Sequence, residues 1–188
     1  MGVTAEQRVG ADAQSAVARE FSDFVRSRSP ALLRTAFLLT GDRHLAEDLV
    51  QEALARTHRA RGRLAGGGHF EAYTRTAIYH IQVSRWRRHR VPESLPGELA
   101  DLPQASGDHA ERIDLQVTLH QALGRLTQRQ RAVLVLRFFE DRSEAEAADM
   151  LSCSVGTVKS QTSKALARLR TIAPELLATR PNREESDD

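Results

Sequence analysis

Residues Ser154–Arg170 have the sequence SVGTVKSQTSKALARLR, with a Gly and a Thr near the start of a predicted helix. Small polar and basic residues are mixed here with an apolar series at helical spacing. That spacing predicts one buried face and an opposite face that is polar and cationic. The predicted inward residues are Val155, Val158, Ala165, Leu166 and Leu169. Such a pattern is typical of a helix that lies in a DNA groove, or of an ordinary amphipathic surface helix.

The residues before this helix predict a partner helix a short way back along the chain. Ser143 and Glu146 have the spacing of a capping box, and an apolar series follows them. Residues 152–154 then interrupt the pattern before the next helix begins. A helix, a three-residue turn and a second helix have the spacing of a helix-turn-helix motif. A plain helical hairpin without a role on DNA is the alternative.

The outward side chains of the second helix have the chemistry needed to contact DNA. Lys and Gln can bond to base edges, whereas Ser and Thr can bond to phosphates or bases. Backbone amides near Gly156 lie at a helix N-terminus, where a phosphate is favoured. The candidate DNA contacts are Thr157, Lys159, Ser160, Gln161, Ser163, Lys164 and Arg168.

The first part of the chain also predicts helices. Ser29–Pro30 is typical of an N-cap and first helical residue, and Gly41 is typical of a stop. Asp42 then caps a helix, and a break at residues 66–68 separates it from a long helix over about Phe70–His89. The predicted buried positions are Leu45, Leu49, Ala53 and Leu54 in the first helix after Gly41, and Phe70, Tyr73, Ala77, Ile78 and Ile81 in the second.

Charge is unevenly distributed, although the net charge is only +2. Nine Arg residues lie between residues 56 and 90, where Glu71 is the only acid. Between residues 92 and 114 six acids stand against Arg112, and Pro and Gly interrupt the apolar period. The basic block suits a polyanion, and the acidic stretch has the composition of a linker. Two modules on such a linker could contact separate sites on one duplex.

These patterns predict an all-α chain of two small helical domains joined by a flexible acidic linker, the second a helix-turn-helix domain. A capping box at Thr127–Gln130 and the apolar residues Ile113, Leu115, Leu119 and Leu123 place further helices in the second domain. The predicted divisions are a disordered leader at 1–20, a first domain at 21–91, the linker at 92–111, the second domain at 112–178 and a polar tail at 179–188.

Composition excludes several classes of protein. The chain is 40% apolar and 28% charged, as in ordinary globular proteins, and no run approaches the ~20 apolar residues of a membrane span. The N-terminus lacks an apolar signal core, so a cytoplasmic location is expected. Cys153 is the only cysteine, which excludes an internal disulfide and a Cys-rich zinc site. The seven His form no metal-ligand set, and the Gly66–Gly68 run lacks the residues of a phosphate loop. We therefore expect no metal, no cofactor and no enzymatic activity.

Two strings resemble parts of bacterial sigma factors, especially those of the extracytoplasmic-function (ECF) group. Residues 137–170, RFFEDRSEAEAADMLSCSVGTVKSQTSKALARLR, resemble the domain that recognises the minus-35 promoter element. Residues 44–57, HLAEDLVQEALART, look like the segment that binds the clamp helices of the largest polymerase subunit. The resemblance implies that Asp48, Gln51 and Glu52 form this contact. A solvated acidic face is the alternative.

A third string, FEAYTRTAIYHIQVSRWRRHR at residues 70–90, resembles the segment that melts promoter DNA. Aromatic rings stack on bases of melted DNA, and Arg neutralises phosphates. The resemblance implies minus-10 DNA contacts from His80, Arg85, Trp86, Arg87 and Arg88. Trp86 could equally be a core residue. Tyr73 stands at a usual Trp position, and we expect its ring in the core.

The resemblance spans residues 21–177 and is strongest to the actinobacterial SigE-type group. It implies an alternative sigma factor that binds core RNA polymerase, directs it to minus-35/minus-10 promoters and melts the minus-10 element. The implied partners are the clamp helices, the flap of the second-largest subunit, promoter DNA and an anti-sigma factor, with no membrane insertion. The alternative function is a dimeric helix-turn-helix regulator that binds duplex DNA without core polymerase.

Overall fold

The computed structural model describes residues 5–66, 68–88 and 118–174. All regular structure in these ranges is helical and no strand occurs in them, which confirms the all-α prediction. The predicted linker at 92–111 and the tail at 179–188 lie outside the described residues.

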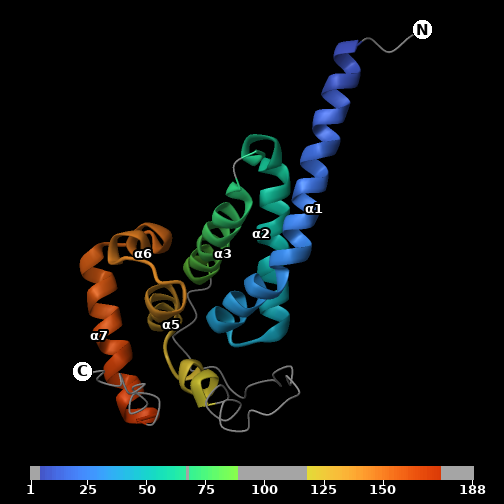
Figure 1. The fold of residues 1–188 in the computed structure, drawn as a ribbon. Coiled ribbons are helices and arrows are strands. Elements are labelled where there is room, and N and C mark those ends of the chain that lie inside the picture. The colour runs from blue at the N-terminus through green and yellow to red at the C-terminus, as the bar shows by residue number, and fades with distance from the viewer. Residues whose placement is uncertain (1–4, 67, 89–117, 175–188) are drawn as a thin grey trace, which may run out of the picture.

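Three helices form the first module: α1 (Ala5–Thr40), α2 (Arg43–Leu64) and α3 (His69–Arg88). Helix α2 packs against both α1 and α3, and the N-terminal part of α1 projects beyond the other two (Figure 1).

Two sequence predictions about α1 are wrong. The helix does not begin at Ser29, because Ser29 Oγ donates back to the Val25 carbonyl oxygen at 2.6 Å within a continuous helix. Pro30 lies inside the helix and does not start it. The predicted leader is helical from Ala5 onward, in a stretch rich in Ala and other good helix formers.

The junction between α1 and α2 follows the sequence signals. The Gly41 amide donates to the Phe37 carbonyl oxygen at 2.8 Å, and its φ of +73° ends α1 in the left-handed region. Asp42 Oδ1 accepts a hydrogen bond from the Leu45 amide at 2.8 Å and so caps α2. The predicted stop and cap are therefore confirmed.

The second module consists of helical residues 118–124, α5 (Gln128–Leu134), the π-helical η1 (Val135–Phe139), α6 (Glu144–Leu151) and α7 (Val155–Ile172). Both predicted capping boxes are present, at Thr127 with Gln130 and at Ser143 with Glu146. The widened turn of η1 was not predicted; it is closed by the Glu140 amide, which donates to the Val135 carbonyl oxygen at 2.9 Å.

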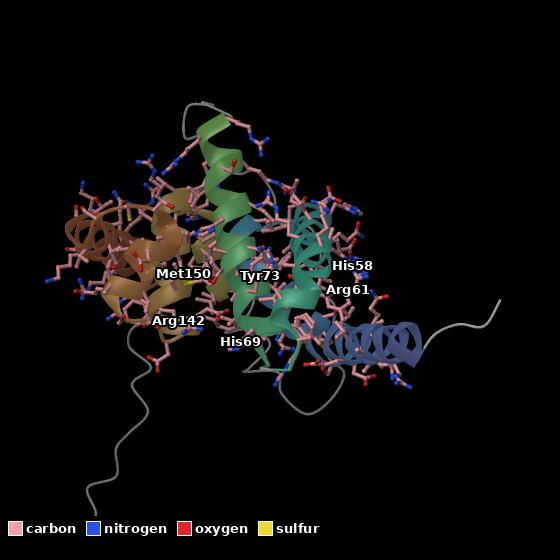
Figure 2. All side chains as sticks on the ribbon, turned by 90° about the horizontal axis from the view of Figure 1, so that it is seen from above. His58, Arg61, His69, Tyr73, Arg142 and Met150 are labelled. Carbon is pink, nitrogen blue, oxygen red and sulfur yellow. The ribbon has the colours of Figure 1, made fainter. Side chains whose placement is uncertain are left out.

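The two modules pack against each other. Helix α1 contacts α5 and η1, while α3 contacts α6, so one hydrophobic core continues from the first module into the second. Seen from above, α3 lies between α2 on one side and the second module on the other (Figure 2). Two modules free to contact separate sites were expected, whereas the structure brings them together.

Most predicted core positions are buried, including Leu49, Ala53, Phe70, Ala77, Ile78, Ile81, Val158, Ala165 and Leu169. Three predictions are wrong: Leu45 is 51% exposed, Val155 40% and Tyr73 37%. Leu45 and Val155 lie in the first turns of α2 and α7, where neighbouring helices do not cover the apolar face.

Candidate nucleic-acid interface

Helix α7 is set against α6 by a short, tightly bonded turn. Ser152 ends α6 with a left-handed φ of +50°, and the Cys153 amide donates to the Ala148 carbonyl oxygen at 3.0 Å. Ser154 then caps α7, because its Oγ accepts from the Thr157 amide at 3.1 Å. This geometry fixes the direction of α7, whose polar face contains the predicted DNA contacts.

The predicted contacts along α7 differ in exposure. Lys159, Ser160, Ser163 and Lys164 are exposed, whereas Thr157, Gln161 and Arg168 are half-buried. Thr157 Oγ1 lies 2.9 Å from Ser154 Oγ, and Lys159 Nζ lies 3.6 Å from a Glu144 carboxylate oxygen. Arg168 Nε is buried without a hydrogen-bond partner among the described residues, so this guanidinium turns partly toward the protein. Gln161 and Lys164 lie between these side chains, nearer the middle of α7.

The predicted minus-10 residues are divided between two environments on α3. His80, Arg87 and Arg88 are exposed. Trp86 is half-buried and packs against the core, which is the alternative that the sequence left open for it. Arg85 is half-buried and its Nη2 donates to Glu52 Oε2 at 3.1 Å.

The predicted polymerase-binding residues lie along α2. Asp48 and Gln51 are exposed, whereas Glu52 is half-buried between Arg56 of its own helix, at 2.8 Å, and Arg85 of α3. Burial alone raises the pKa of Glu52, but hydrogen bonds from Arg85 and Arg56 and their positive charges outweigh burial and lower it. Glu52 is thus an ionised acceptor that is already bonded to two cations.

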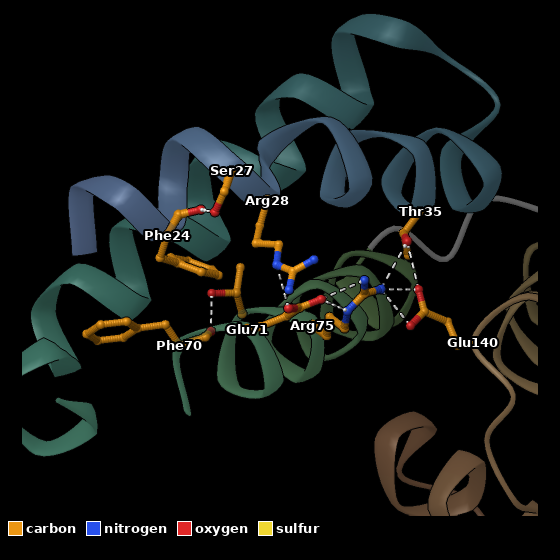
Figure 3. Close-up of polar contacts among 9 residues, drawn as sticks. Phe24, Ser27, Arg28, Thr35, Phe70, Glu71, Arg75 and Glu140 are labelled. Atoms are coloured by element: carbon orange, nitrogen blue, oxygen red, sulfur yellow. Dashed lines mark hydrogen bonds and ion pairs between the residues drawn. The ribbon is translucent and has the colours of Figure 1, made fainter. Parts of the chain in front are cut away.

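Sequence reasoning missed a polar cluster where the modules meet (Figure 3). Thr35 Oγ1 of α1 donates to Glu140 Oε1 at 2.7 Å, and Arg75 Nη1 of α3 donates to Glu140 Oε2 at 2.6 Å. Arg75 Nη2 also donates to Glu71 at 3.0 Å, and Glu71 in turn pairs with Arg28 at 3.0 Å. Glu71 and Arg75 form a local i,i+4 pair, but Thr35 and Glu140 are far from them in the sequence, and no local pattern predicts that they meet.

Arg131 is a second buried charge without a sequence signal. It is 1% exposed, and its Nε and Nη2 donate to the carbonyl oxygens of Leu123 and Gly124 at 2.9 and 3.2 Å. Burial lowers the pKa of Arg131 to about 10, so the guanidinium stays charged at neutral pH. It stabilises the end of helix 118–124 by bonding to its last carbonyl groups.

Other kinds of site find little support in the part of the chain that the structure describes. That part contains no group of three His, Cys, Asp or Glu able to hold a metal ion. Cys153 is half-buried, and burial raises the pKa of its thiol. Among the same residues, none of the helices has the length and apolar character needed to span a bilayer.

Comparison with known proteins identifies the family of each of the two modules. Residues 24–91 match the family model for sigma-70 region 2, and residues 116–169 match sigma-70 region 4. The chain is 38% identical to the RNA polymerase sigma-E factor of Streptomyces coelicolor, over 89% of this chain and 95% of the relative. It is 40% identical to the sigma-E factor of Streptomyces avermitilis, over 80% and 83% of the two chains.

A solved structure shares the fold. The sigma factor RpoE of Bartonella quintana, crystallised with the anti-sigma factor NepR, aligns with a TM-score of 0.60 at 26% identity. The alignment covers 86% of this chain and 98% of the RpoE chain. By sequence, by domain order and by fold, the chain belongs to the sigma-70 family of RNA polymerase sigma factors, as an ECF member of the SigE type.

Proposed function

We propose that the first module binds core RNA polymerase and opens the minus-10 element, while the second module recognises the minus-35 element. The observation that carries this proposal is that one chain presents both an acidic face on α2 and a polar, cationic face on α7. A regulator that only binds duplex DNA needs the second face but not the first. As sigma factors are transcription initiation factors, we propose that the polymerase supplies all catalysis and that this chain is no enzyme.

The acidic face of α2 is the proposed contact for the clamp helices of the largest subunit. Asp48 and Gln51 are free to approach a basic partner helix, because both are exposed on α2. Glu52 lies one turn beyond Asp48, and its carboxylate is shared with Arg56 and Arg85. Electrostatic attraction of this kind chiefly accelerates association and fixes the register of the partners.

The proposed minus-35 contacts are the polar residues of α7, with Gln161 and Lys164 as the readers of base edges. The second module also exposes two aromatic side chains, Phe138 at 63% and Phe139 at 53%, at the end of η1. Exposed aromatic pairs favour protein contacts, and we assign them to the flap of the second-largest subunit. Promoter and polymerase would then bind different parts of the same module.

The proposed minus-10 contacts are the cationic residues near the end of α3. Arg87 and Arg88 are exposed and can neutralise phosphates, and His80 is exposed two turns earlier. Trp86 packs against the core, so its indole ring supports the fold of α3 in the free protein. Because the polymerase acts on chromosomal DNA, we place the protein in the cytoplasm, with an anti-sigma protein as a further partner.

Run-off transcription tests this function directly. Purified protein is added to sigma-free core polymerase of a related bacterium and a library of promoter fragments. We expect discrete transcripts that require the protein, with start sites that define a two-part promoter. If no transcript appears and the protein alone binds duplex DNA tightly as a dimer, it is a conventional regulator and the proposal is wrong. An Asp48→Lys variant serves as the matched control, because its weaker binding to core polymerase should reduce the amount of transcript at the same protein concentration.

A further inference from the structure

Two arginines from different helices share one carboxylate on the proposed polymerase face of α2. Glu52 Oε1 accepts a hydrogen bond from Arg56 Nη2 at 2.8 Å, one turn further along α2. Glu52 Oε2 accepts a second bond from Arg85 Nη2 of α3 at 3.1 Å. The side chains of Glu52, Arg56 and Arg85 are 38%, 39% and 28% exposed, so a partner can reach the carboxylate from solvent.

The position of Arg85 opposite Glu52 is set by the packing of α2 against α3, which lie side by side (Figure 1). Between the two helices, Thr57 Oγ1 lies 2.8 Å from Thr74 Oγ1, and both threonines are fully buried. A buried polar contact of this kind specifies one register of the helices. An exchange of partners at Glu52 therefore needs only side-chain rotation, while α2 and α3 stay in place.

Of the two bonds to Glu52, the one from Arg85 is the first to yield to a competing cation. Arg56 follows Glu52 by four residues on the same helix, which is the favourable order for such a pair, and its bond is the shorter one. Asp48 is exposed one turn before Glu52 and attracts cations to the same face. A basic partner bound there competes with Arg85 for the Glu52 carboxylate.

A displaced Arg85 lies close to another proposed DNA contact of α3. Arg88 is three residues further along, which places the two side chains on one side of the helix, and Arg88 is exposed. A guanidinium released from a carboxylate can neutralise a phosphate of melted DNA. While Arg85 is bonded to Glu52, a phosphate gains less from it, because the carboxylate cancels much of its charge.

We propose that Glu52 couples the two binding faces of the first module, because it binds Arg85 in the free protein and releases it to DNA when polymerase engages the carboxylate. The coupling is reciprocal: DNA that binds Arg85 leaves Glu52 to polymerase, so each partner strengthens binding of the other. A half-exposed ion pair contributes modestly, which limits the coupling to about two- to fivefold. The proposal rests on the proposed function, because it needs polymerase at α2 and DNA at α3.

Titration of labelled full-length protein with core polymerase tests one half of the coupling. Arg85→Met should bind core polymerase about two- to fivefold more tightly than the wild type, because polymerase no longer has to displace Arg85 from Glu52. Arg59→Met is the matched control, because it removes the same charge from an exposed position two turns beyond Glu52 on α2. In a Glu52→Gln background, Arg85→Met should leave polymerase affinity unchanged, which completes a double-mutant cycle.

Binding of a labelled oligo-dT strand to the full-length protein without polymerase tests the other half. Glu52→Gln should bind this strand about two- to fivefold more tightly than the wild type, because Arg85 keeps its full charge. Addition of Arg85→Met should abolish that gain. Glu47→Gln is the matched control: Glu47 is 40% exposed and pairs with Arg43 within α2 at 2.9 Å, so the same charge is lost from a pair inside one helix. Circular dichroism verifies the helix content of every variant.

The two titrations distinguish failure of the coupling from failure of the proposed function. If polymerase binds and Arg85→Met gains no more affinity than Arg59→Met, the sigma function stands and the coupling is overturned. Equal gains in oligo-dT affinity for Glu47→Gln and Glu52→Gln also overturn it, because they show an effect of net charge alone. If neither the wild type nor any variant binds polymerase, the sigma function fails, and a gain confined to Glu52→Gln then still establishes that Glu52 keeps Arg85 from DNA.

Discussion

Glu52, an acid proposed to face the polymerase, accepts a hydrogen bond at 3.1 Å from Arg85, an arginine proposed to face promoter DNA. The pair links α2 to α3 across the first module. A partner cation that binds Glu52 would compete with Arg85 for the same carboxylate, so in the proposed function polymerase binding and DNA binding are coupled through this contact. Asp48, one turn away on α2, is exposed and forms no ion pair with another of the described residues.

The first prediction separates these two acids. Asp48→Lys should weaken binding to core polymerase by about tenfold or more, equivalent to about 1.4 kcal/mol, without changing the free energy of unfolding. Glu52→Lys should lower both the affinity for core polymerase and the free energy of unfolding, because it also places a third cation beside Arg56 and Arg85. Titration of labelled protein with core polymerase and urea unfolding measure the two effects. The control is Asp149→Lys in the second module. Equal losses of polymerase affinity in all three variants would show that α2 has no specific binding face.

The second prediction concerns the pH dependence of the same pair. Because the pKa of Glu52 is lower in the folded chain, the pair stabilises the fold above the ordinary value of 4.5, and this contribution is lost as the pH falls through the lowered pKa. Glu52→Gln should therefore be less stable than the wild type at pH 7, by a modest amount since Glu52 is half-buried. The difference should vanish in acid. Urea unfolding of both proteins from pH 7 to 3 checks this, and a constant difference would contradict it.

Periodicity predicted the buried side of each helix better than it predicted the helix ends. Ile78 and Ala165 follow the 3.6-residue period and are buried, since many neighbours surround the middle of a helix. Leu45 and Val155 obey the same period and are exposed, because burial near an end depends on which other element covers it. Pro30 shows a related limit, as a proline can either start or bend a helix.

The site was predictable where it depends on local sequence. Ser154 and Ser143 cap their helices as the motif requires, and the turn at residues 152–154 follows from their spacing. The contacts of Glu140 were not predictable, since they link elements distant in sequence. Arg131 was missed because it buries a charge that a sequence alone would place in solvent. The acidic and cationic faces were recognised by resemblance. The ion pairs between them, such as Glu52 with Arg85, could be identified only from the structure.

The third prediction tests the proposed minus-35 helix. Gln161→Ala or Lys164→Ala should weaken binding of the polymerase holoenzyme to the minus-35 element, with about 1–3 kcal/mol for a lost base-edge contact. Thr171→Ala is the control, because this exposed residue lies at the far end of α7. Competition footprinting on promoters with intact and altered minus-35 elements measures the effect. If both variants bind like the control, these side chains are only solvated.

The fourth prediction concerns phosphate contacts of α3. Arg88→Ala, and Arg87→Ala with Arg88→Ala, should weaken open-complex formation and reduce its dependence on salt, since each lost phosphate contact lowers the slope by about 1. The single variant is needed because Arg87 also donates to the Ser152 carbonyl oxygen, so the double variant removes a contact between the modules as well. Arg59→Ala with Arg63→Ala, at exposed positions of α2, is the control. An unchanged salt slope in the double variant would place the DNA path elsewhere.

The fifth prediction uses two glycines as opposite controls. Gly41 has a φ of +73°, and an added Cβ would lie 2.7 Å from Arg131 Nη1. The guanidinium cannot withdraw freely, because its Nε and Nη2 are bonded to the carbonyl oxygens of Leu123 and Gly124. Gly41→Ala should therefore lower the free energy of unfolding by the about 1–2 kcal/mol of left-handed strain, with a further loss from the displaced Arg131.

Gly62 lies inside α2 with nothing within 4 Å of an added Cβ. Gly62→Ala should raise the free energy of unfolding by about 0.5–1 kcal/mol, because Ala is the better helix former. Gly41→Asn separates the two causes at position 41, since Asn tolerates a positive φ but adds the same Cβ. If Asn restores the stability lost with Ala, strain dominates; if it is equally unstable, contact with Arg131 dominates. Urea unfolding measures all three variants, and a Gly41→Ala protein as stable as Gly62→Ala would show that Arg131 does not pack against this turn.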